Sequence, residues 1–115
     1  MHWTEITERV NGGVVILDVR GHMTLAEEEG LLFRRIGVLA DHGHIRVVLN
    51  LQNIAYVDSV GIGEIVRAYM RLTRGGGALK LCAVAPRISE VLEAKNLNSV
   101  LAVYDSEEEA LRSFE

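Results

Sequence analysis

The chain has 115 residues and a formal net charge of −4, and 49% of its residues are hydrophobic although only 5% are aromatic. This length and composition predict a single domain over residues 1–115 with a core built from aliphatic side chains. The acidic balance argues against a phosphate-backbone partner, so we expect no direct binding to nucleic acid.

No apolar run approaches the length that crosses a bilayer, and the amino end lacks the basic and apolar pattern of a signal peptide. We therefore expect a cytoplasmic protein without membrane contact. The one cysteine, Cys82, lies inside the apolar run 79–84. This position predicts a small buried side chain with no redox role.

The amino-terminal half of the chain predicts a hairpin, a helix and a buried strand. An Asn-Gly-Gly run at 11–13 separates two strand-like segments, which is a strong hairpin signal. Thr24 followed by Glu27 fits a capping box, and the helix that should follow ends near 41–43. One face of this helix carries Leu25, Leu32, Ile36 and Leu39. The apolar segment 45–51 is typical of a central strand in a parallel sheet.

The carboxyl-terminal half predicts two more strands, each followed by a helix. The glycine run 75–77 ends the preceding helix, and strands are expected at 78–84 and 100–104. Pro86 suits the first turn of a short helix, and Ser106, with a glutamate three residues later, fits a second capping box. The inward positions of these helices are Ile88, Val91, Leu92, Ala110, Leu111 and Phe114. The order β-β-α-β-α-β-α-β-α predicts an α/β domain with a mixed, mostly parallel sheet opened by a β-hairpin.

The stretch 58–63, Asp-Ser-Val-Gly-Ile-Gly, lies where the buried strand is followed by an amphipathic helix. Ser59 is thus near a helix N-terminus, where unpaired N–H groups and the dipole favour added negative charge, such as a phosphate. Asp58 or Ser59 also suits an ordinary N-cap. Helical spacing predicts that Glu64, Arg67 and Arg71 stay in solvent. The stripe expected to face the core consists of Ile62, Ile65, Val66, Tyr69, Met70 and Thr73.

Residues 50–63, which end in Asp-Ser-x-Gly-x-Gly, resemble the signature of STAS domains, and in particular of the bacterial anti-sigma factor antagonists. The resemblance covers nearly the whole chain. It includes the order of elements, the glycine run at 75–77 with the strand after it, and the closing helix around 107–111. It implies a single STAS-like domain.

In that family, the serine of the motif is phosphorylated by a partner that is both an anti-sigma factor and a serine protein kinase, and a serine phosphatase removes the phosphate. The resemblance implies that Ser59 is the acceptor. It also implies that the unmodified protein binds the anti-sigma factor and so frees a sigma factor for transcription. Val60 stands where the family often has a second small or hydroxylated residue, which leaves Ser59 as the only acceptor in the motif.

The partner is expected to contact the surface around Ser59. The resemblance implies that Asp58 helps to present the hydroxyl and that Gly61 and Gly63 let the partner approach the backbone. Ile54 and Val57 are equally consistent with positions in the core. The full set of expected contact residues is Met23, Thr24, Ile54, Tyr56, Asp58, Val60, Gly61, Ile62 and Gly63.

Other functions compete with this interpretation. A serine hydrolase elbow has the form Gly-x-Ser-x-Gly, of which only the downstream glycine is present, and a nucleotide loop would need a third glycine after 61–63. No histidine is placed by the sequence as a catalytic base or as part of a metal site; the four are His2, His22, His42 and His44. We expect no enzyme activity, no metal and no cofactor. The main alternative is a STAS interaction module that is not phosphorylated and serves as a scaffold in a stress complex or a transport system.

Overall fold

The structure, a computed structural model, describes residues 4–23 and 30–115. The strands within these ranges are β1 (Thr4–Asn11), β2 (Val14–Met23), β3 (Arg46–Val57), β4 (Ala78–Cys82) and β5 (Ala102–Tyr104). The helices are α1 (Leu31–Asp41), α2 (Ser59–Arg74), α3 (Pro86–Ala94) and α4 (Glu107–Arg112), with a short 3₁₀ turn, η1 (Leu97–Ser99). The predicted order of strands and helices is confirmed.

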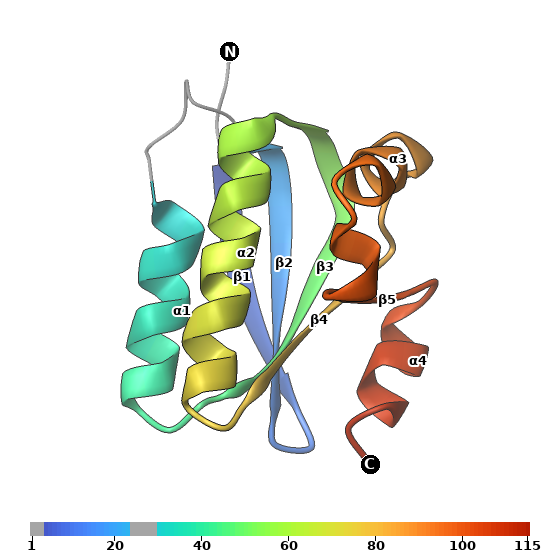
Figure 1. Ribbon diagram of the computed structural model, residues 1–115. Coiled ribbons are helices and arrows are strands. Elements are labelled where there is room, and N and C mark those ends of the chain that lie inside the picture. The colour runs from blue at the N-terminus through green and yellow to red at the C-terminus, as the bar shows by residue number, and fades with distance from the viewer. Residues whose placement is uncertain (1–3, 24–29) are drawn as a thin grey trace.

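The strands form one sheet in the order β1-β2-β3-β4-β5 (Figure 1). β1 and β2 are antiparallel, and the other neighbouring pairs are parallel. The hairpin closes at Asn11 and Val14, and Gly12 and Gly13 adopt φ angles of 57° and 82°, which a tight hairpin turn requires. The predicted hairpin and mostly parallel sheet are therefore confirmed. Because β2 and β3 are parallel and Met23 pairs with Val57, the carboxyl ends of these two strands lie together where α2 begins.

Helices cover both faces of this sheet. α1, α2 and α3 pack over a large core on one face, and α4 packs over a smaller core on the other (Figure 1). Side chains of β2 alternate between the two: Val15 and Leu17 enter the large core, and Val14 and Ile16 the smaller one. The predicted burial of Cys82 is confirmed, since it lies in the smaller core, where burial raises the pKa of its thiol to about 11.

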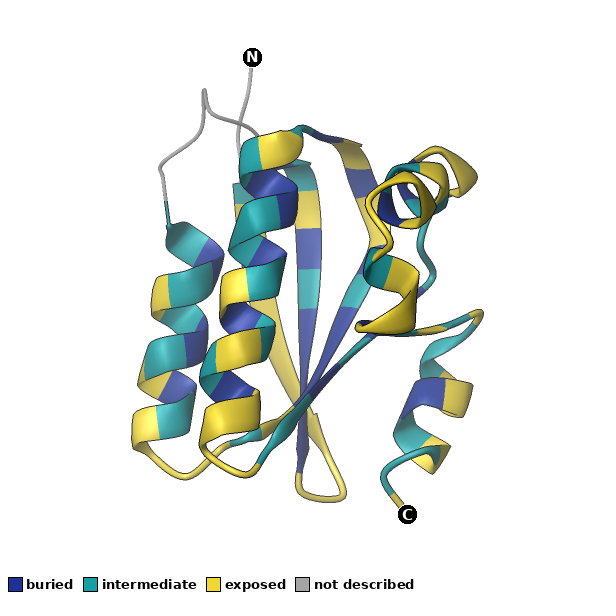
Figure 2. Cartoon of the chain, viewed as in Figure 1, coloured by how far each residue is buried: buried dark blue, intermediate teal, exposed yellow. Residues whose placement is uncertain are grey.

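Most helix positions predicted to face the core do so, and Figure 2 shows the buried residues along the inner sides of α1 and α2. Val91, Leu111 and Phe114 are only partly buried, although they pack against the two cores. The predicted capping box of Thr24 and Glu27, together with Leu25, lies outside the described residues. The confirmed buried positions are Leu32, Ile36, Leu39, Ile88, Leu92 and Ala110.

Three strand boundaries differ from the prediction. β3 continues to Val57, so the whole segment before Asp58 is extended. β4 ends at Cys82 because Ala83 has a positive φ of 56°, which interrupts an extended strand. β5 begins only at Ala102, since η1 ends at Ser99 and residues 100–101 form a turn and a bend before the strand.

The face of α2 that packs on the sheet was predicted wrongly in part. Ile62 and Ile65 are buried as expected, but Met70 is 42% exposed and Thr73 is also exposed. The prediction followed the large apolar residues, whereas the inward side of the helix also includes the small residues Gly61 and Ala68. The buried residues of α2 are Gly61, Ile62, Ile65, Ala68 and Leu72.

Helix α4 is fastened to the hairpin by a cluster of charged groups. Arg9 donates two hydrogen bonds to Asp18, at 2.6 and 2.8 Å, and two to Glu107, at 2.5 and 3.1 Å. Asn50 also donates to Glu107, at 3.2 Å. The hydrogen bonds to Glu107, those from Arg9 foremost, lower the pKa of its carboxyl. The role of Glu107 in joining these distant segments was not predicted from the sequence.

The lowered pKa of Glu107 predicts how stability depends on pH. The ordinary pKa of this group is about 4.5, so its ionised form stabilises the fold above that pH, and the contribution is lost as pH falls through the lower pKa of the folded state. We expect Glu107→Gln to have a lower free energy of unfolding than the wild type at pH 7. The difference between the two proteins should disappear as the pH is lowered towards about 3. Urea unfolding of both proteins across this range measures the effect. Glu108→Gln is the control, because Glu108 lies 3.9 Å from Arg112 in an exposed pair. A deficit independent of pH would contradict the assignment.

Candidate functional site

The start of α2 is fixed by Asp58, the residue between β3 and the helix. The Asp58 carboxylate accepts hydrogen bonds from the N–H groups of Val60 and Gly61, at 3.0 and 3.1 Å. Its backbone is extended, as an N-cap requires, and its own N–H donates to the carbonyl of Met23 at 3.2 Å. Asp58 therefore caps α2 and ties it to the end of β2.

Gly61 lets the first turn of α2 lie directly on the end of β2. A Cβ atom at this position would lie 2.2 Å from the Met23 carbonyl oxygen and 2.9 Å from Cγ1 of Val57. Gly63, in contrast, has nothing within 4 Å of the place where its Cβ would be. The two glycines of the motif thus differ: Gly61 allows packing within the chain, and only Gly63 leaves the helix surface open from outside.

Glu64 joins α2 to α1. Its carboxylate accepts hydrogen bonds from the N–H groups of Leu32, at 2.5 Å, and Phe33, at 3.1 Å. These are N–H groups of the first turn of α1, whose N-cap Gly30 supplies no side-chain acceptor. The prediction that Glu64 lies in solvent is therefore wrong, because it caps the neighbouring helix.

Ser59 is the first residue of α2 and is exposed. Its hydroxyl makes no hydrogen bond with residues 4–23 or 30–115, because the neighbouring Asp58 already supplies the cap. Figure 1 shows this end of α2 at one end of the domain, beside the carboxyl ends of β2 and β3. The structure thus places the hydroxyl where another protein can reach it, beside a helix end that favours negative charge.

The residues expected to contact a partner divide by exposure. Tyr56 is 46% exposed, and Asp58, Val60 and Gly63 are partly buried. Thr24 lies outside the described residues. The remaining four residues are buried beneath this surface, where they pack between β2, β3 and α2, so they offer a partner little contact area. They are Met23, Ile54, Gly61 and Ile62.

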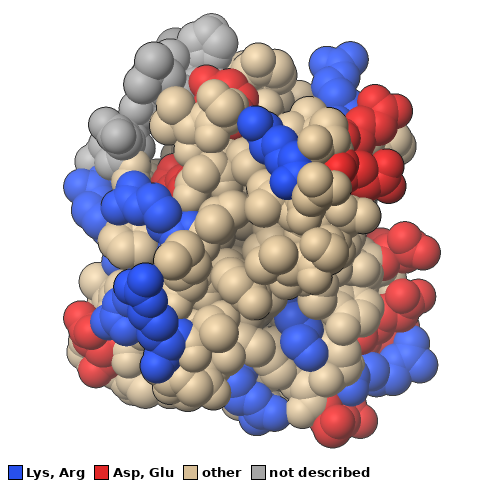
Figure 3. Space-filling view, in the orientation of Figure 1, with Lys and Arg blue, Asp and Glu red and all other residues tan. Residues whose placement is uncertain are grey.

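A groove of about 390 Å³ lies next to the site, between the end of β3 and the first turns of α3. The walls of this groove come from segments about 30 residues apart, so no local sequence pattern indicates it. Figure 3 shows a broad uncharged surface in this part of the molecule, between α2 and α3. The lining residues are Ala55, Tyr56, Val57, Ala85, Arg87, Ile88 and Val91.

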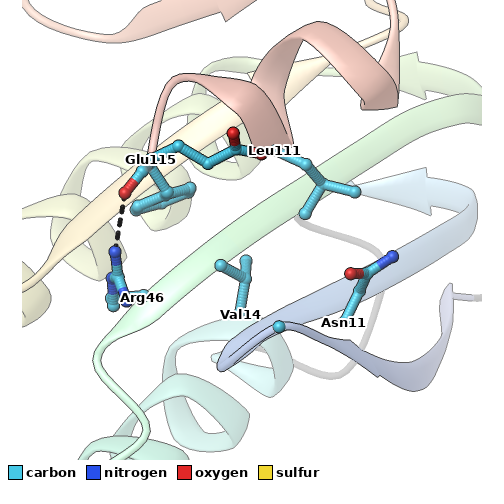
Figure 4. A pocket seen from close by; sticks show the side chains of 7 residues that line it. Asn11, Val14, Arg46, Leu111 and Glu115 are labelled. Carbon is cyan, nitrogen blue, oxygen red and sulfur yellow. Dashed lines mark hydrogen bonds between the residues drawn. The ribbon is translucent and has the colours of Figure 1, made fainter.

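A second cavity, of about 250 Å³, lies at the opposite end of the sheet (Figure 4). It is bounded by the hairpin residue Asn11, by Val14, and by Arg46 at the start of β3. Arg46 donates to the carbonyl of Phe114 at 2.7 Å and lies over its ring, so its guanidinium holds the end of the chain in place. This cavity is remote from Ser59, which follows the carboxyl end of β3.

Among residues 4–23 and 30–115, no histidine forms a hydrogen bond with the Ser59 hydroxyl. His42 and His44 are exposed residues before the amino end of β3, and His22 pairs with Tyr56 between β2 and β3. Within the described part of the chain, no group of three or more His, Cys, Asp or Glu residues could hold a metal ion. In the same part, no helix is both long enough and apolar enough to pass through a membrane.

The model of the STAS domain family matches residues 5–110, so the chain belongs to the STAS family. A protein of Paenibacillus polymyxa named anti-sigma F factor antagonist is 33% identical over 69 residues, which are 60% of this chain and 59% of that protein. A second relative is BtrV of Bordetella bronchiseptica, which is named as a proposed anti-sigma factor antagonist. It is 30% identical over 102 residues, which are 89% of this chain and 87% of that protein.

Solved structures share the fold. An anti-sigma factor antagonist from Mycobacterium paratuberculosis superposes with a TM-score of 0.82 and 19% identity, covering 96% of this chain and 92% of that one. The Bacillus cell fate determinant SpoIIAA in its phosphorylated form superposes with a TM-score of 0.71 and 17% identity. The match covers 96% of this chain and 100% of that one. The predicted STAS-like fold is therefore confirmed.

The contrast between the two glycines predicts opposite effects of the same substitution. Gly61→Ala should destabilise the protein by about 1–3 kcal/mol, because the methyl group meets the Met23 carbonyl. Gly63→Ala should stabilise it by up to about 1 kcal/mol, since alanine favours a helix and has space there. Urea unfolding of both variants measures this, and equal effects would contradict the packing described.

Asp58 and Ser59 should also differ, although either residue suits an N-cap. Asp58→Ala should lower the free energy of unfolding by about 1 kcal/mol, because two N–H groups lose their acceptor. Ser59→Ala should change it by less than about 0.5 kcal/mol, as for an exposed surface position. Thermal unfolding followed by circular dichroism compares the two. A larger loss for Ser59→Ala would make Ser59 the capping residue.

Proposed function

We propose that the chain is a cytoplasmic anti-sigma factor antagonist that acts by binding and not by catalysis. In this proposal, the unphosphorylated form binds an anti-sigma factor with serine kinase activity and so frees a sigma factor. Transfer of the γ-phosphoryl group of ATP to the Ser59 hydroxyl, with release of ADP and the hydroxyl proton, ends the binding. A serine phosphatase restores the hydroxyl.

The observation that carries the proposal is the exposed hydroxyl of Ser59, which bonds to none of the described residues and lies beside a cap formed by Asp58. If Ser59 were needed to cap α2, its modification would disturb the fold. Because Asp58 supplies the cap, the hydroxyl can be modified while α2 keeps its place. The names of the Paenibacillus and Bordetella relatives, and the phosphorylated form of SpoIIAA, support the same function for this chain.

A phosphate at this position affects folding and binding differently. A phosphoserine carries about −1.5 to −2 charges, which the N-terminus of the 16-residue helix α2 favours. In an interface, the same charge near partner carboxylates costs several kcal/mol. A cost of about 4 kcal/mol would weaken binding about a thousandfold. One phosphate therefore suffices to separate the two proteins without unfolding either.

Incubation with the anti-sigma kinase of the same organism and ATP should add one phosphate, seen in the intact mass of the protein. The Ser59→Ala variant should gain none. Ser106→Ala is the matched control and should still gain it, because the Ser106 hydroxyl accepts a hydrogen bond from the Glu109 N–H at the start of α4.

Phosphate persisting in Ser59→Ala would reject Ser59 as the acceptor. Absence of phosphate from the wild type, together with stable assembly into a larger complex, would favour the alternative of a scaffold module that is not phosphorylated.

A further inference from the structure

One ridge, exposed at every member except the partly buried Gly63, runs the whole length of α2 from the proposed phosphate acceptor. Its members follow one another at intervals of three or four residues, the spacing at which side chains share one face of a helix. Gly63 opens the surface next to Ser59, and Met70 presents a thioether side chain that is 42% exposed. We call this set the α2 ridge; it consists of Ser59, Gly63, Arg67, Met70 and Arg74.

The two arginines of the α2 ridge have no carboxylate partner among the described residues, in contrast to several others in the chain. Arg9, Arg35 and Arg71 form ion pairs with Asp18, Glu8 and Asp41. Arg67 and Arg74 are exposed and form none within residues 4–23 and 30–115. Figure 3 shows basic side chains gathered over α1 and α2 on this face. A chain of net charge −4 thus carries a locally positive surface along α2.

Arg67 is also held in place before any partner arrives. Its guanidinium lies over the ring of Phe33 in α1, with Cζ 4.3 Å from the ring centroid. A stacked guanidinium keeps its hydrogen-bond donors free for a carboxylate, and it loses less side-chain freedom on binding than a mobile one. This contact makes Arg67 a preorganised cation beside Met70.

We propose that the α2 ridge docks an acidic surface of the anti-sigma factor, with carboxylates opposite Arg67 and Arg74 and an apolar pocket for Met70. The identity of the partner rests on the proposed function, whereas its chemistry follows from the ridge. Charge complementarity selects this occupant, because interfaces place opposite charges against each other and use methionine and arginine as anchors. Two arginines are too few for a nucleic-acid backbone on an acidic protein.

This partner chemistry also explains why a phosphate at Ser59 opposes docking. Ser59 is at the end of the same ridge, so a surface attracted by the two arginines meets a new dianion at the first turn of α2. Phosphorylation would then act through the charge on the ridge, with no change in the fold of the chain.

Calorimetric titration of the unphosphorylated full chain with the anti-sigma factor of its own organism tests the proposal. The double variant Arg67→Glu/Arg74→Glu should bind at least about tenfold more weakly, because two attractions become repulsions. Wild-type affinity should fall when salt rises from about 50 mM to about 300 mM, and that of the double variant should not. Equal affinities for wild type and double variant would overturn the proposal.

Matched controls separate docking from folding. Arg112→Glu makes the same charge change on α4, which covers the opposite face of the sheet, and should bind as the wild type does. Arg74→Glu alone leaves the contact between Arg67 and Phe33 intact and should still weaken binding. An effect of Arg112→Glu as large as that of Arg74→Glu would overturn the proposal, because net charge alone would then explain the loss.

Two further outcomes distinguish this proposal from others. If the arginine variants bind weakly but Ser59 gains no phosphate, the docking surface stands and the proposed switch fails. The reverse result, a working switch with unaffected arginine variants, overturns only the docking surface. Sedimentation with vesicles of anionic phospholipid tests a membrane as the occupant. A protein partner at this ridge would be contradicted if the wild type binds these vesicles, the double variant does not, and both bind the anti-sigma factor with the same affinity.

Discussion

The close approach between the first turn of α2 and the end of β2 determines the geometry of the site. Gly61 lies against the Met23 carbonyl, and that carbonyl accepts the Asp58 N–H at 3.2 Å. The Asp58 carboxylate then caps the helix, and the next residue, Ser59, keeps an exposed hydroxyl that makes no hydrogen bond within residues 4–23 and 30–115. Each step requires the one before it. A side chain at position 61 would lift the helix from the sheet, and loss of the cap would allow its first turn to fray.

Folding and docking depend on different residues of the same helix. The inward side of α2 holds Ile65, Ala68 and Leu72 against the sheet, and Glu64 caps α1. The outward side carries the proposed acceptor, Met70 and the arginines. Because few contacts are shared, a charge added outside can change binding with little effect on the interior. On the other face of the sheet, α4 is fastened by Glu107 and contributes stability away from the proposed interface.

Local sequence signals predicted the fold well. The Asn-Gly-Gly turn, the alternating strands and the STAS resemblance were enough for the hairpin, the parallel sheet and the start of α2. Predictions failed where tertiary contacts override local pattern. Met70 was expected in the core, but α2 turns Gly61, Ala68 and Leu72 inward and leaves Met70 42% exposed. Glu64 was expected in solvent. Its carboxylate instead accepts hydrogen bonds from the first turn of α1, which lies about 30 residues away in the sequence, so no local pattern could indicate this role.

Tertiary contacts also determine the details of the site that the sequence left open. The sequence placed Ser59 at the helix start, but it did not distinguish Asp58 from Ser59 as the cap, or Gly61 from Gly63 as the open position. The most direct test of the account is the dissociation constant of the anti-sigma factor for the purified protein before and after phosphorylation at Ser59. The account predicts an increase of about a thousandfold. Equal dissociation constants for the two forms would contradict it.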